Sequence, residues 1–378
     1  MAEAVLIIDG TCAMAGAMDM NRNLTAPLEE ARGATRIHDV RLGWPDAEMT
    51  CTLPEMRRAR MAVAVPKVLG CMHHQTQPHG RHRTRNHCYA AAHGHLAYYR
   101  ILAKTGEAHI ITNRAELASH LREWTSASDR TTLPVGFIVG MEGADPILWP
   151  EQVFEWWEDG IRMVSLCHAG INAYAHGEAC GVNGGLFPPA RELLRHMEAL
   201  GMILDVTHSS DRSLAESLDS FGGPVVATHH ACRTLVPGER QLPDYLLTLI
   251  VERGAVVGVP MHADMLHRGV QINWLEGAGN APIRERFPRD GVSLEDFCDH
   301  VDHICQLAGD STHAGIGGDT DGQGGRPGAP SGVESVVDYQ KVVAVLENRG
   351  YARADIDNVM HMNWQRLFER CLPAGDSL

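Results

Sequence analysis

Short apolar runs that end in polar side chains alternate along the chain with segments of helical periodicity. The apolar residues of these runs are continuous rather than interleaved with polar ones, which is typical of parallel strands buried on both faces. Eight such runs lie at residues 4–9, 60–65, 135–142, 162–168, 202–208, 224–230, 254–261 and 313–319. Eight strands that alternate with helices predict the α/β class and a (β/α)8 TIM barrel.

The segments between these runs carry helix signals. Residues 188–201 begin with two prolines, place leucines and a methionine at helical spacing, and end at a glycine, which suits the end of a helix. Similar patterns lie at residues 243–254, 333–350 and 352–371. The chain shows no internal repeat and no linker, so we expect a single domain over residues 1–378.

One segment, near residues 71–95, departs from this pattern because it is rich in histidine and arginine and lacks apolar periodicity. Two interpretations stay open. The segment is an exposed polar insertion in the barrel, or it is a loop over the barrel mouth. Such a loop would contact an anionic substrate or supply a metal ligand.

Net charge and composition argue against two classes of protein, those that bind nucleic acids and those that associate with membranes. The formal net charge of −14 argues against nucleic-acid binding, which needs a basic face. No apolar stretch approaches the ~20 residues that a membrane helix needs, so we expect no membrane association. The ten cysteines lie mostly in apolar runs, and no secretory signal precedes the first predicted strand. We therefore expect reduced thiols and a cytoplasmic protein.

Polar side chains stand at the ends of the predicted strands, where the chemistry of a parallel barrel lies. Four successive strands end in Glu142, His168, His208 and His229, and the last strand ends in Asp319. A lone histidine after a strand is more often structural, but an ordered series of this kind is a stronger signal. Imidazoles and a carboxylate form a zinc site with an open position, and a separate aspartate can accept a proton from an activated water.

Four stretches resemble the membrane (renal) dipeptidase family of zinc hydrolases. They are GLFPPARELLRHMEALGMILDVTHSS (185–210), PVVATHHACRTLVPGERQLPD (224–244), HAGIGGDTDG (313–322) and RGYARADIDNVMHMNWQRLFER (349–370). The resemblance covers residues 130–370 well and residues 1–130 only loosely. It implies a metal-dependent, amidohydrolase-like barrel that cleaves dipeptides, often with a D-residue at the second position.

By position, the resemblance implies a role for each strand-end residue. Glu142 matches the glutamate that bridges two metals, and His208 and His229 match the histidines of the second metal. His168 matches the histidine thought to polarise the scissile carbonyl and stabilise the tetrahedral intermediate. Asp319 matches the carboxylate near the metals and the substrate amine, which makes it the candidate general acid/base.

The first predicted strand departs from the family pattern. The family carries Asp-Gly-His-x-Asp there, and that histidine and second aspartate hold the first metal. This chain has Asp9, Gly10, Thr11, Cys12 and Ala13 instead. Two divalent cations a few ångströms apart repel each other and need anionic ligands to offset that repulsion. We therefore expect one zinc, on the glutamate and the two histidines named above, and a second site that is weak or absent.

Two ways of restoring the lost site stay open. Cys12 is a good zinc ligand, but side chains alternate along a strand, so Thr11 and Ala13 share the site face and Cys12 points away. A histidine from the 71–95 segment is the other candidate.

The predicted function is hydrolysis of the amide bond of a dipeptide, or of a similar small amide, by metal-activated water. Arg233 matches the family's arginine for the substrate's C-terminal carboxylate; the alternative is that it pairs with a surface acid. Two alternative functions are a divergent hydrolase that tailors a biosynthetic product and a catalytically inactive metal-binding homologue. The expected partners are a dipeptide or small-molecule substrate, with no nucleic acid and no membrane, and family precedent makes a homodimer an expectation for assembly.

Overall fold

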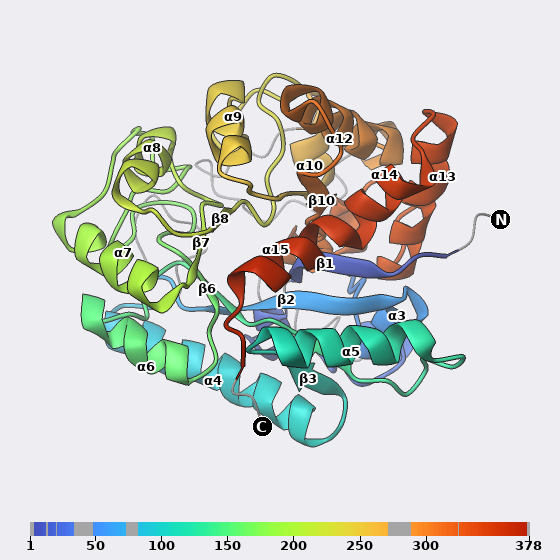
Figure 1. Ribbon diagram of the computed structural model, residues 1–378, viewed down its shortest axis with the longest axis horizontal. Helices are drawn as coiled ribbons and strands as arrows, with labels where there is room; N and C mark the ends of the chain where they lie inside the picture. Colours follow the sequence, from blue (N-terminus) through green and yellow to red (C-terminus); the bar gives the residue numbers. More distant parts are fainter. Residues whose placement is uncertain are drawn as a thin grey trace.

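A computed structural model describes residues 4–12, 14–19, 21–33, 48–72, 82–270, 289–323 and 325–375 of the chain. At its centre lies a sheet whose strands are all paired in parallel (Figure 1). The strands are β1 (Ile7–Cys12), β2 (Met61–Leu69), β3 (Ala108–Ile110), β4 (Val135–Phe137), β5 (Gly140–Glu142), β6 (Met163–Ser165), β7 (Ile203–Asp205), β8 (Val225–Val226), β9 (Val257–Val259) and β10 (Ala314–Ile316).

The sheet closes into a barrel. Its strands follow the order β8-β7-β6-β5-β2-β1-β10-β9, and a parallel bridge between Ala227 and Val257 joins the two ends of this path. β4 and β5 together fill one position of the ring, because β2 pairs with β4 through its first half and with β5 through its second half. The predicted (β/α)8 barrel is confirmed, and each of the eight predicted runs overlaps at least one strand.

β3 is a strand that the sequence pattern did not indicate. It is three residues long, lies off the closed path and pairs only with β4 among the described strands. Its sequence, Ala-His-Ile, has a polar residue at its centre and so lacks the continuous apolar run on which the other strands were predicted.

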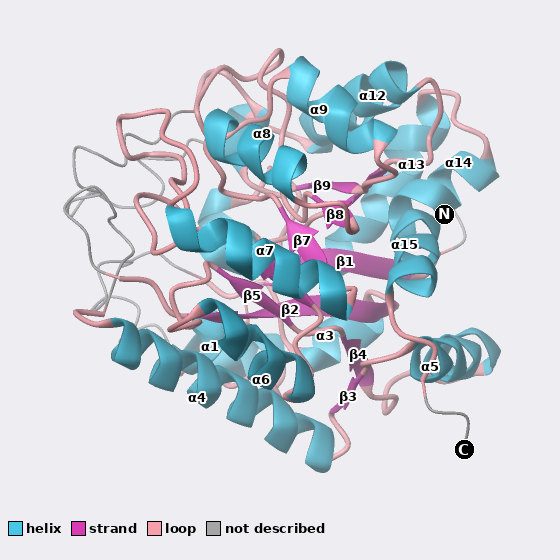
Figure 2. Ribbon diagram, turned by 60° about the vertical axis from the view of Figure 1, so that its left-hand side comes forward, coloured by secondary structure: helices cyan, strands magenta, loops and turns pink. Residues whose placement is uncertain are grey.

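Helices surround the barrel on its outer side (Figure 2). The α-helices are α1 (Ala15–Asp19), α3 (Leu53–Arg58), α4 (Arg85–Lys104), α5 (Arg114–Ser126), α6 (Val153–Glu158), α7 (Pro188–Leu200), α8 (Asp211–Ser220), α9 (Asp244–Glu252), α10 (Ala263–Leu266), α12 (Leu294–Ala308), α13 (Lys341–Asn348), α14 (Arg353–Asp357) and α15 (Asn363–Cys371). Short helical turns are η1 (Pro150–Gln152), η3 (Arg289–Gly291), η4 (Thr320–Gln323), η5 (Arg326–Gly328), η6 (Val336–Gln340) and η7 (Asn358–Met362).

Helices lie in all four predicted segments, but in residues 333–350 the α-helix α13 covers only Lys341–Asn348 and follows the 3-10 turn η6. α7 ends at Gly201, whose φ of 69° is the left-handed conformation that the terminal glycine was expected to supply. The predicted helix over residues 352–371 is interrupted, because η7 is a turn of π-helix between α14 and α15.

Trp364 of α15 packs against β1 and β10. Its indole Nε1–H donates to the carbonyl oxygen of Ile316, at 2.9 Å. Two strand residues, Gly10 and Gly315, lie so close to the ring that a Cβ would stand 2.3 and 2.6 Å from it. Only glycine leaves room for the tryptophan at these positions, which explains a glycine within each of two buried strands.

The histidine-rich segment is partly helical. α4 begins at Arg85, where the Thr84 side chain accepts a hydrogen bond from the His87 amide. Residues 85–95 therefore belong to a helix and not to a loop. His95 is buried: its Nδ1 accepts from the Leu69 amide at 3.1 Å, and its Nε2 lies 3.0 Å from an Asp19 oxygen. Residues 73–81 lie outside the described residues.

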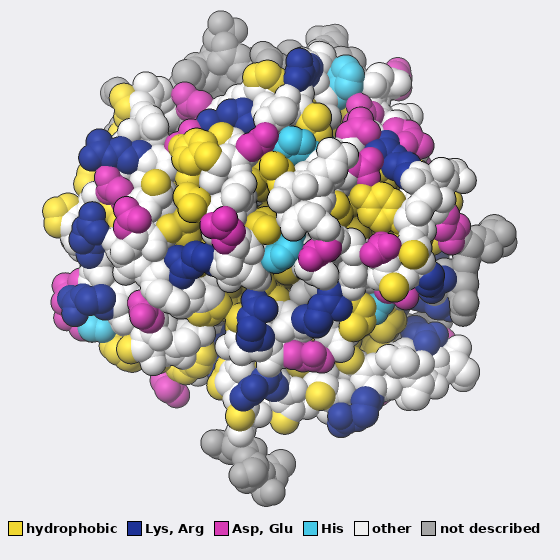
Figure 3. All heavy atoms as spheres, turned by 45° about the horizontal axis from the view of Figure 1, so that its top comes forward, with side chains coloured by type: hydrophobic (Ala, Val, Ile, Leu, Met, Phe, Trp, Pro, Cys, Tyr) yellow, Lys and Arg dark blue, Asp and Glu magenta, His cyan; other side chains and the backbone are white. Residues whose placement is uncertain are grey.

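The surface mixes charged and apolar side chains. Basic and acidic groups are interspersed over the face that Figure 3 shows. Within the described part of the chain, no helix combines the length and the apolar character needed to cross a bilayer.

Candidate metal centre

Three potential metal ligands meet at the carboxyl ends of the barrel strands. His208 Nε2 lies 3.0 Å from Glu142 Oε1 and 3.0 Å from His229 Nε2. His229 Nε2 lies 3.3 Å from the same Glu142 oxygen. The structure thus brings together the three residues that the sequence predicted as ligands.

Strand register explains why residues so far apart in the chain converge here. Asp205 of β7 pairs with Ser165 of β6 and with Val226 of β8. His168, His208 and His229 each follow one of these paired positions by three residues. On the other side of the ring, Val259 of β9 pairs with Ile316 of β10, and His262 and Asp319 follow by the same interval.

Glu178 fixes the orientation of His208. Its carboxylate oxygen lies 2.6 Å from His208 Nδ1, and because a carboxylate only accepts, Nδ1 carries the proton. Burial alone would lower the pKa of His208, but the charge of Glu178 outweighs burial and raises that pKa to about 9. A metal ion at Nε2 would displace the proton that this cation carries there, while Nδ1 would keep its hydrogen bond to Glu178. Burial likewise opposes ionisation of Glu178, yet the charge of His208 brings the pKa of Glu178 to about 2. A carboxylate behind a ligating histidine is a common support in metal sites.

Two hydroxyl groups fix the tautomer of His229. Its Nδ1 lies 3.1 Å from Thr11 Oγ1 and 3.1 Å from Thr228 Oγ1. The Thr11 hydroxyl donates to the Gly10 carbonyl and the Thr228 hydroxyl donates to Asp205, so both oxygens are acceptors toward the ring. His229 therefore carries its proton on Nδ1 and presents the Nε2 lone pair to the centre. Burial lowers the pKa of His229 to about 4, which keeps the ring neutral.

The donor set fits a divalent metal. Burial opposes ionisation of Glu142, but the hydrogen bond and the positive charge of the His208 ring outweigh it and hold the pKa of Glu142 well below its ordinary value. The ligand atoms of the three residues all lie within 4.8 Å of one another. Two imidazole nitrogens and an ionised carboxylate are the ligands of catalytic zinc sites, which keep a further position open.

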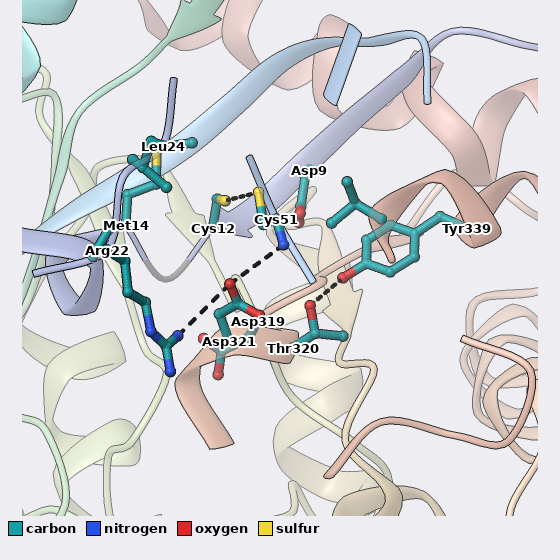
Figure 4. Close-up of a pocket in the computed structure, with 12 residues that line it drawn as sticks. Asp9, Cys12, Met14, Arg22, Leu24, Cys51, Asp319, Thr320, Asp321 and Tyr339 are labelled. Carbon is teal, nitrogen blue, oxygen red and sulfur yellow. Dashed lines mark hydrogen bonds and ion pairs between the residues drawn. The ribbon is translucent and has the colours of Figure 1, made fainter. Parts of the chain in front are cut away.

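The first strand does not rebuild a second metal site among the described residues. Thr11 faces His229, whereas the Cys12 sulfur lies 3.5 Å from the Cys51 sulfur, on the side of a small cavity that Figure 4 shows. Ala13 lies outside the described residues. Elsewhere in the described part of the chain, one further ligand-like group occurs, formed at the surface by Glu151, Glu192 and His196.

Asp319 stands beside the centre in an unusual backbone conformation. Its Oδ2 lies 3.7 Å from His229 Nε2, and its φ is 60°, in the left-handed region. Burial and the charge of Glu142 raise the pKa of Asp319 well above its ordinary value. A carboxyl group that holds its proton more tightly than usual is suited to general acid/base chemistry.

His168 completes the group at the barrel mouth. Its ring lies 4.3 Å from the ring of His208, centroid to centroid. The side-chain oxygen of Asn172 accepts a hydrogen bond from the His168 amide at 3.2 Å, which holds the loop after β6 in place.

The structure places Arg233 apart from this group. Its guanidinium forms a bidentate ion pair with Asp211, at 2.6 and 2.7 Å, and also donates to the Gln241 carbonyl. Arg240 lies closer to the centre: it donates to the His229 carbonyl at 2.9 Å and stands 3.6 Å from Glu178.

Sequence patterns did not single out Glu178, Arg240 or His262. Glu178 and Arg240 lie in loops without periodicity, so no local signal marked them. His262 directly follows the predicted strand over residues 254–261, so its position after a strand could have marked it as a candidate site residue.

A comparison with models of known protein families shows to which family the chain belongs. The model of the membrane dipeptidases, peptidase family M19, matches residues 46–374. The chain belongs to this family. Among its curated relatives, dipeptidase tcpJ of Claviceps purpurea (strain 20.1) is 30% identical over 207 residues, which is 54% of this chain and 43% of that protein. The uncharacterized dipeptidase C3A11.10c of Schizosaccharomyces pombe is 25% identical over 65% of this chain and 55% of its own length. The chain thus spans about half the length of these relatives.

Solved structures share the fold over nearly the whole chain. The crystal structure of dipeptidase AC, an M19 metallopeptidase, has a TM-score of 0.75 at 20% identity and covers 99% of this chain and 100% of that one. A metallopeptidase from Rhodobacter sphaeroides, bound to a phosphinate mimic of the dipeptide L-Ala-D-Ala, has a TM-score of 0.72 at 20% identity, with coverage of 98% and 100%. At this identity the likeness establishes the M19 barrel fold.

Proposed function

We propose that this M19-family chain hydrolyses the amide bond of a dipeptide, or of a similar small amide, with one zinc ion held by Glu142, His208 and His229. The observation that carries the proposal is the convergence of two oriented imidazole nitrogens and an ionised carboxylate beside Asp319. When bound, zinc supplies Lewis acidity that activates water and polarises a carbonyl. The dipeptidase relatives and the bound dipeptide mimic of a structural neighbour support the substrate class.

The protein's own groups divide the remaining tasks. Asp319 takes a proton from the attacking water and passes it to the leaving amine, which its raised pKa favours. His168, beside His208, donates to the oxygen that becomes negative in the transition state. Because an acid/base group and an oxyanion donor are both kept beside the donor set, an inactive metal-binding homologue is the weaker hypothesis.

A cation near the centre would hold the substrate's terminal carboxylate. The family resemblance assigns this role to Arg233, but Asp211 already occupies that guanidinium with two hydrogen bonds. We therefore propose Arg240 for this role and keep Arg233 as the alternative. Arg240 is the better placed of the two because it touches the backbone of His229.

A second candidate function is a related hydrolase with an altered substrate, such as a biosynthetic tailoring enzyme. Thr11 favours it, because this residue stands where the family pattern has a metal ligand and instead contacts His229. Such an enzyme would cleave an amide other than an ordinary dipeptide.

The compartment, domain organisation and assembly of the chain are also proposals. All ten cysteines are free in the structure, which supports a reducing cytoplasmic environment. We keep one domain over residues 1–378 and a homodimer as the proposed organisation.

Metal-dependent turnover tests the proposed function. The zinc-loaded full chain should hydrolyse L-Ala-D-Ala or another member of a dipeptide panel, lose activity to a chelator, and regain it with about one equivalent of zinc. Glu142→Gln should abolish turnover, whereas Glu151→Gln, in the surface donor group, should leave it unchanged. Absence of cleavage across the panel by a zinc-loaded, folded chain would contradict dipeptide hydrolysis.

A further inference from the structure

We propose that His262 is a positioning residue that holds the backbone and the carboxylate of Asp319 in their working arrangement. The inference rests on the proposed acid/base role of Asp319. His262 is 2% exposed and begins α10, immediately after the end of β9.

One ring nitrogen of His262 faces two oxygens of Asp319. His262 Nε2 lies 2.5 Å from the Asp319 carbonyl oxygen and 3.4 Å from its Oδ2. A carbonyl oxygen only accepts, so Nε2 carries the proton and is the donor. The same N–H group is therefore within reach of the main chain and of the side chain of one residue.

The backbone of Asp319 needs such a restraint. A φ of 60° is uncommon for a residue with a Cβ, and it persists only where surrounding contacts impose it. The Asp319 amide donates to the Thr11 carbonyl at 3.1 Å, and its carbonyl accepts from the Gly322 amide at 2.9 Å. These two bonds hold the main chain alone, whereas His262 also reaches the carboxylate.

The barrel places the two residues opposite each other. Val259 pairs with Ile316 across β9 and β10, and His262 and Asp319 follow these partners by the same interval. The Met261 amide donates to the Gly318 carbonyl at 2.8 Å, which extends the strand contact up to this point. The pairing of β9 with β10 therefore brings His262 close to Asp319.

A purely structural role explains His262 less well. Its Nδ1 is buried and has no hydrogen-bond partner among the described residues, which is unfavourable for a polar atom. Burial lowers the pKa of His262 to about 3, so the ring is neutral and contributes no charge to compensate. A phenyl ring would fill similar space without this penalty, so the Nε2–H group is the property that distinguishes histidine here.

Matched buried histidines test the inference. His120 is 1% exposed, and its Nε2 also contacts a backbone carbonyl, that of Ala62, at 2.8 Å. With L-Ala-D-Ala as substrate, we expect His262→Phe to lower kcat by about tenfold or more, with KM and zinc content nearly unchanged. His262→Gln, which keeps an N–H donor, should recover much of kcat, and His120→Phe should stay within about twofold of the natural chain.

A crystal structure of His262→Phe supplies a readout that does not depend on turnover. We expect Asp319 to leave its left-handed conformation or its carboxylate to turn away from the centre. An unmoved Asp319, or equal kcat for His262→Phe and His120→Phe, would overturn the inference. If His262→Phe does not fold, His262→Asn, which keeps polarity but shortens the reach to Asp319, undergoes the same two measurements. Full turnover by Asp319→Asn would instead overturn the acid/base role and leave the positional finding intact.

Discussion

The hydroxyl oxygen of Thr11 lies 3.1 Å from Nδ1 of His229. At this position the family pattern carries a histidine that binds the first metal. In this chain Thr11 instead accepts a hydrogen bond from Nδ1 of His229. The other ring nitrogen of His229 faces Glu142 and His208. Where the family pattern has a ligand of the first metal, this chain thus has a side chain that supports a proposed ligand of the second.

Replacement of Thr11 should weaken zinc binding. Loss of a group that orients a metal-ligating histidine commonly costs about 10–100-fold in affinity, and the retained Thr228 hydroxyl places the expected loss for Thr11→Val near the lower end. Thr11→Ser keeps the acceptor and should bind zinc like the natural chain. Competition with a chelating dye measures both variants, and equal affinities for valine and serine would contradict this role.

The metal content should be one zinc ion per chain. Protein purified without added metal and then dialysed against zinc should contain about one equivalent by elemental analysis, because the described residues form one buried donor group. His208→Ala should reduce this content sharply. Two equivalents that both disappear in His208→Ala would imply a replacement ligand set for the first site.

Asp319→Asn should separate metal binding from catalysis. The amide cannot exchange a proton as a carboxyl group does, so we expect kcat to fall by about 10²–10⁴-fold with zinc content unchanged. Asp321→Asn is the control: this neighbouring carboxylate accepts from the Thr50 amide and hydroxyl, so its loss should lower the melting temperature rather than kcat. Turnover near that of the natural chain in Asp319→Asn would remove Asp319 from the mechanism.

The two arginines should differ in their effect on substrate binding. We expect Arg240→Gln to raise KM by about tenfold or more, because a charged hydrogen bond to the substrate carboxylate is lost. Arg233→Gln breaks the pair with Asp211 and should mainly affect stability. Steady-state kinetics on L-Ala-D-Ala measures both; a raised KM only in Arg233→Gln would restore the assignment made from sequence.

A buried ion pair between Lys67 and Asp205 should make the free energy of unfolding depend on pH. Lys67 Nζ lies 2.6 Å from Asp205 Oδ2, and both side chains are almost fully buried. Burial alone would raise the pKa of Asp205, but the charge of Lys67 outweighs it and holds that pKa below its ordinary value. The folded pKa is below the unfolded value, so this stabilisation is present at neutral pH and is lost as pH falls below about 4.

Lys67→Met leaves the Asp205 carboxylate buried without its countercharge. We expect a loss of about 3–5 kcal/mol in unfolding free energy at pH 7, measured by urea denaturation. The difference from the natural chain should narrow near pH 3. Lys341→Met, at an exposed pair with Asp338, should cost less than about 1 kcal/mol. Equal losses for Lys67→Met at both pH values would contradict the linkage.

Local patterns in the sequence were sufficient for the barrel and for much of its centre. Continuous apolar runs mark strands buried on both faces, and parallel strands bring their carboxyl ends to one rim. The residues after those runs, among them Glu142, His208, His229 and Asp319, were therefore expected together and do lie together.

Partners across long sequence separations needed the tertiary structure. Glu178 behind His208, Asp211 on Arg233 and His262 against Asp319 are contacts set by strand register and loop path, which leave no periodic trace in the chain. The first strand illustrates both what the sequence determines and what only the tertiary structure decides. Its sequence was sufficient to show that two family metal ligands are missing, but only the folded barrel, by setting Thr11 against His229, shows what replaced one of them.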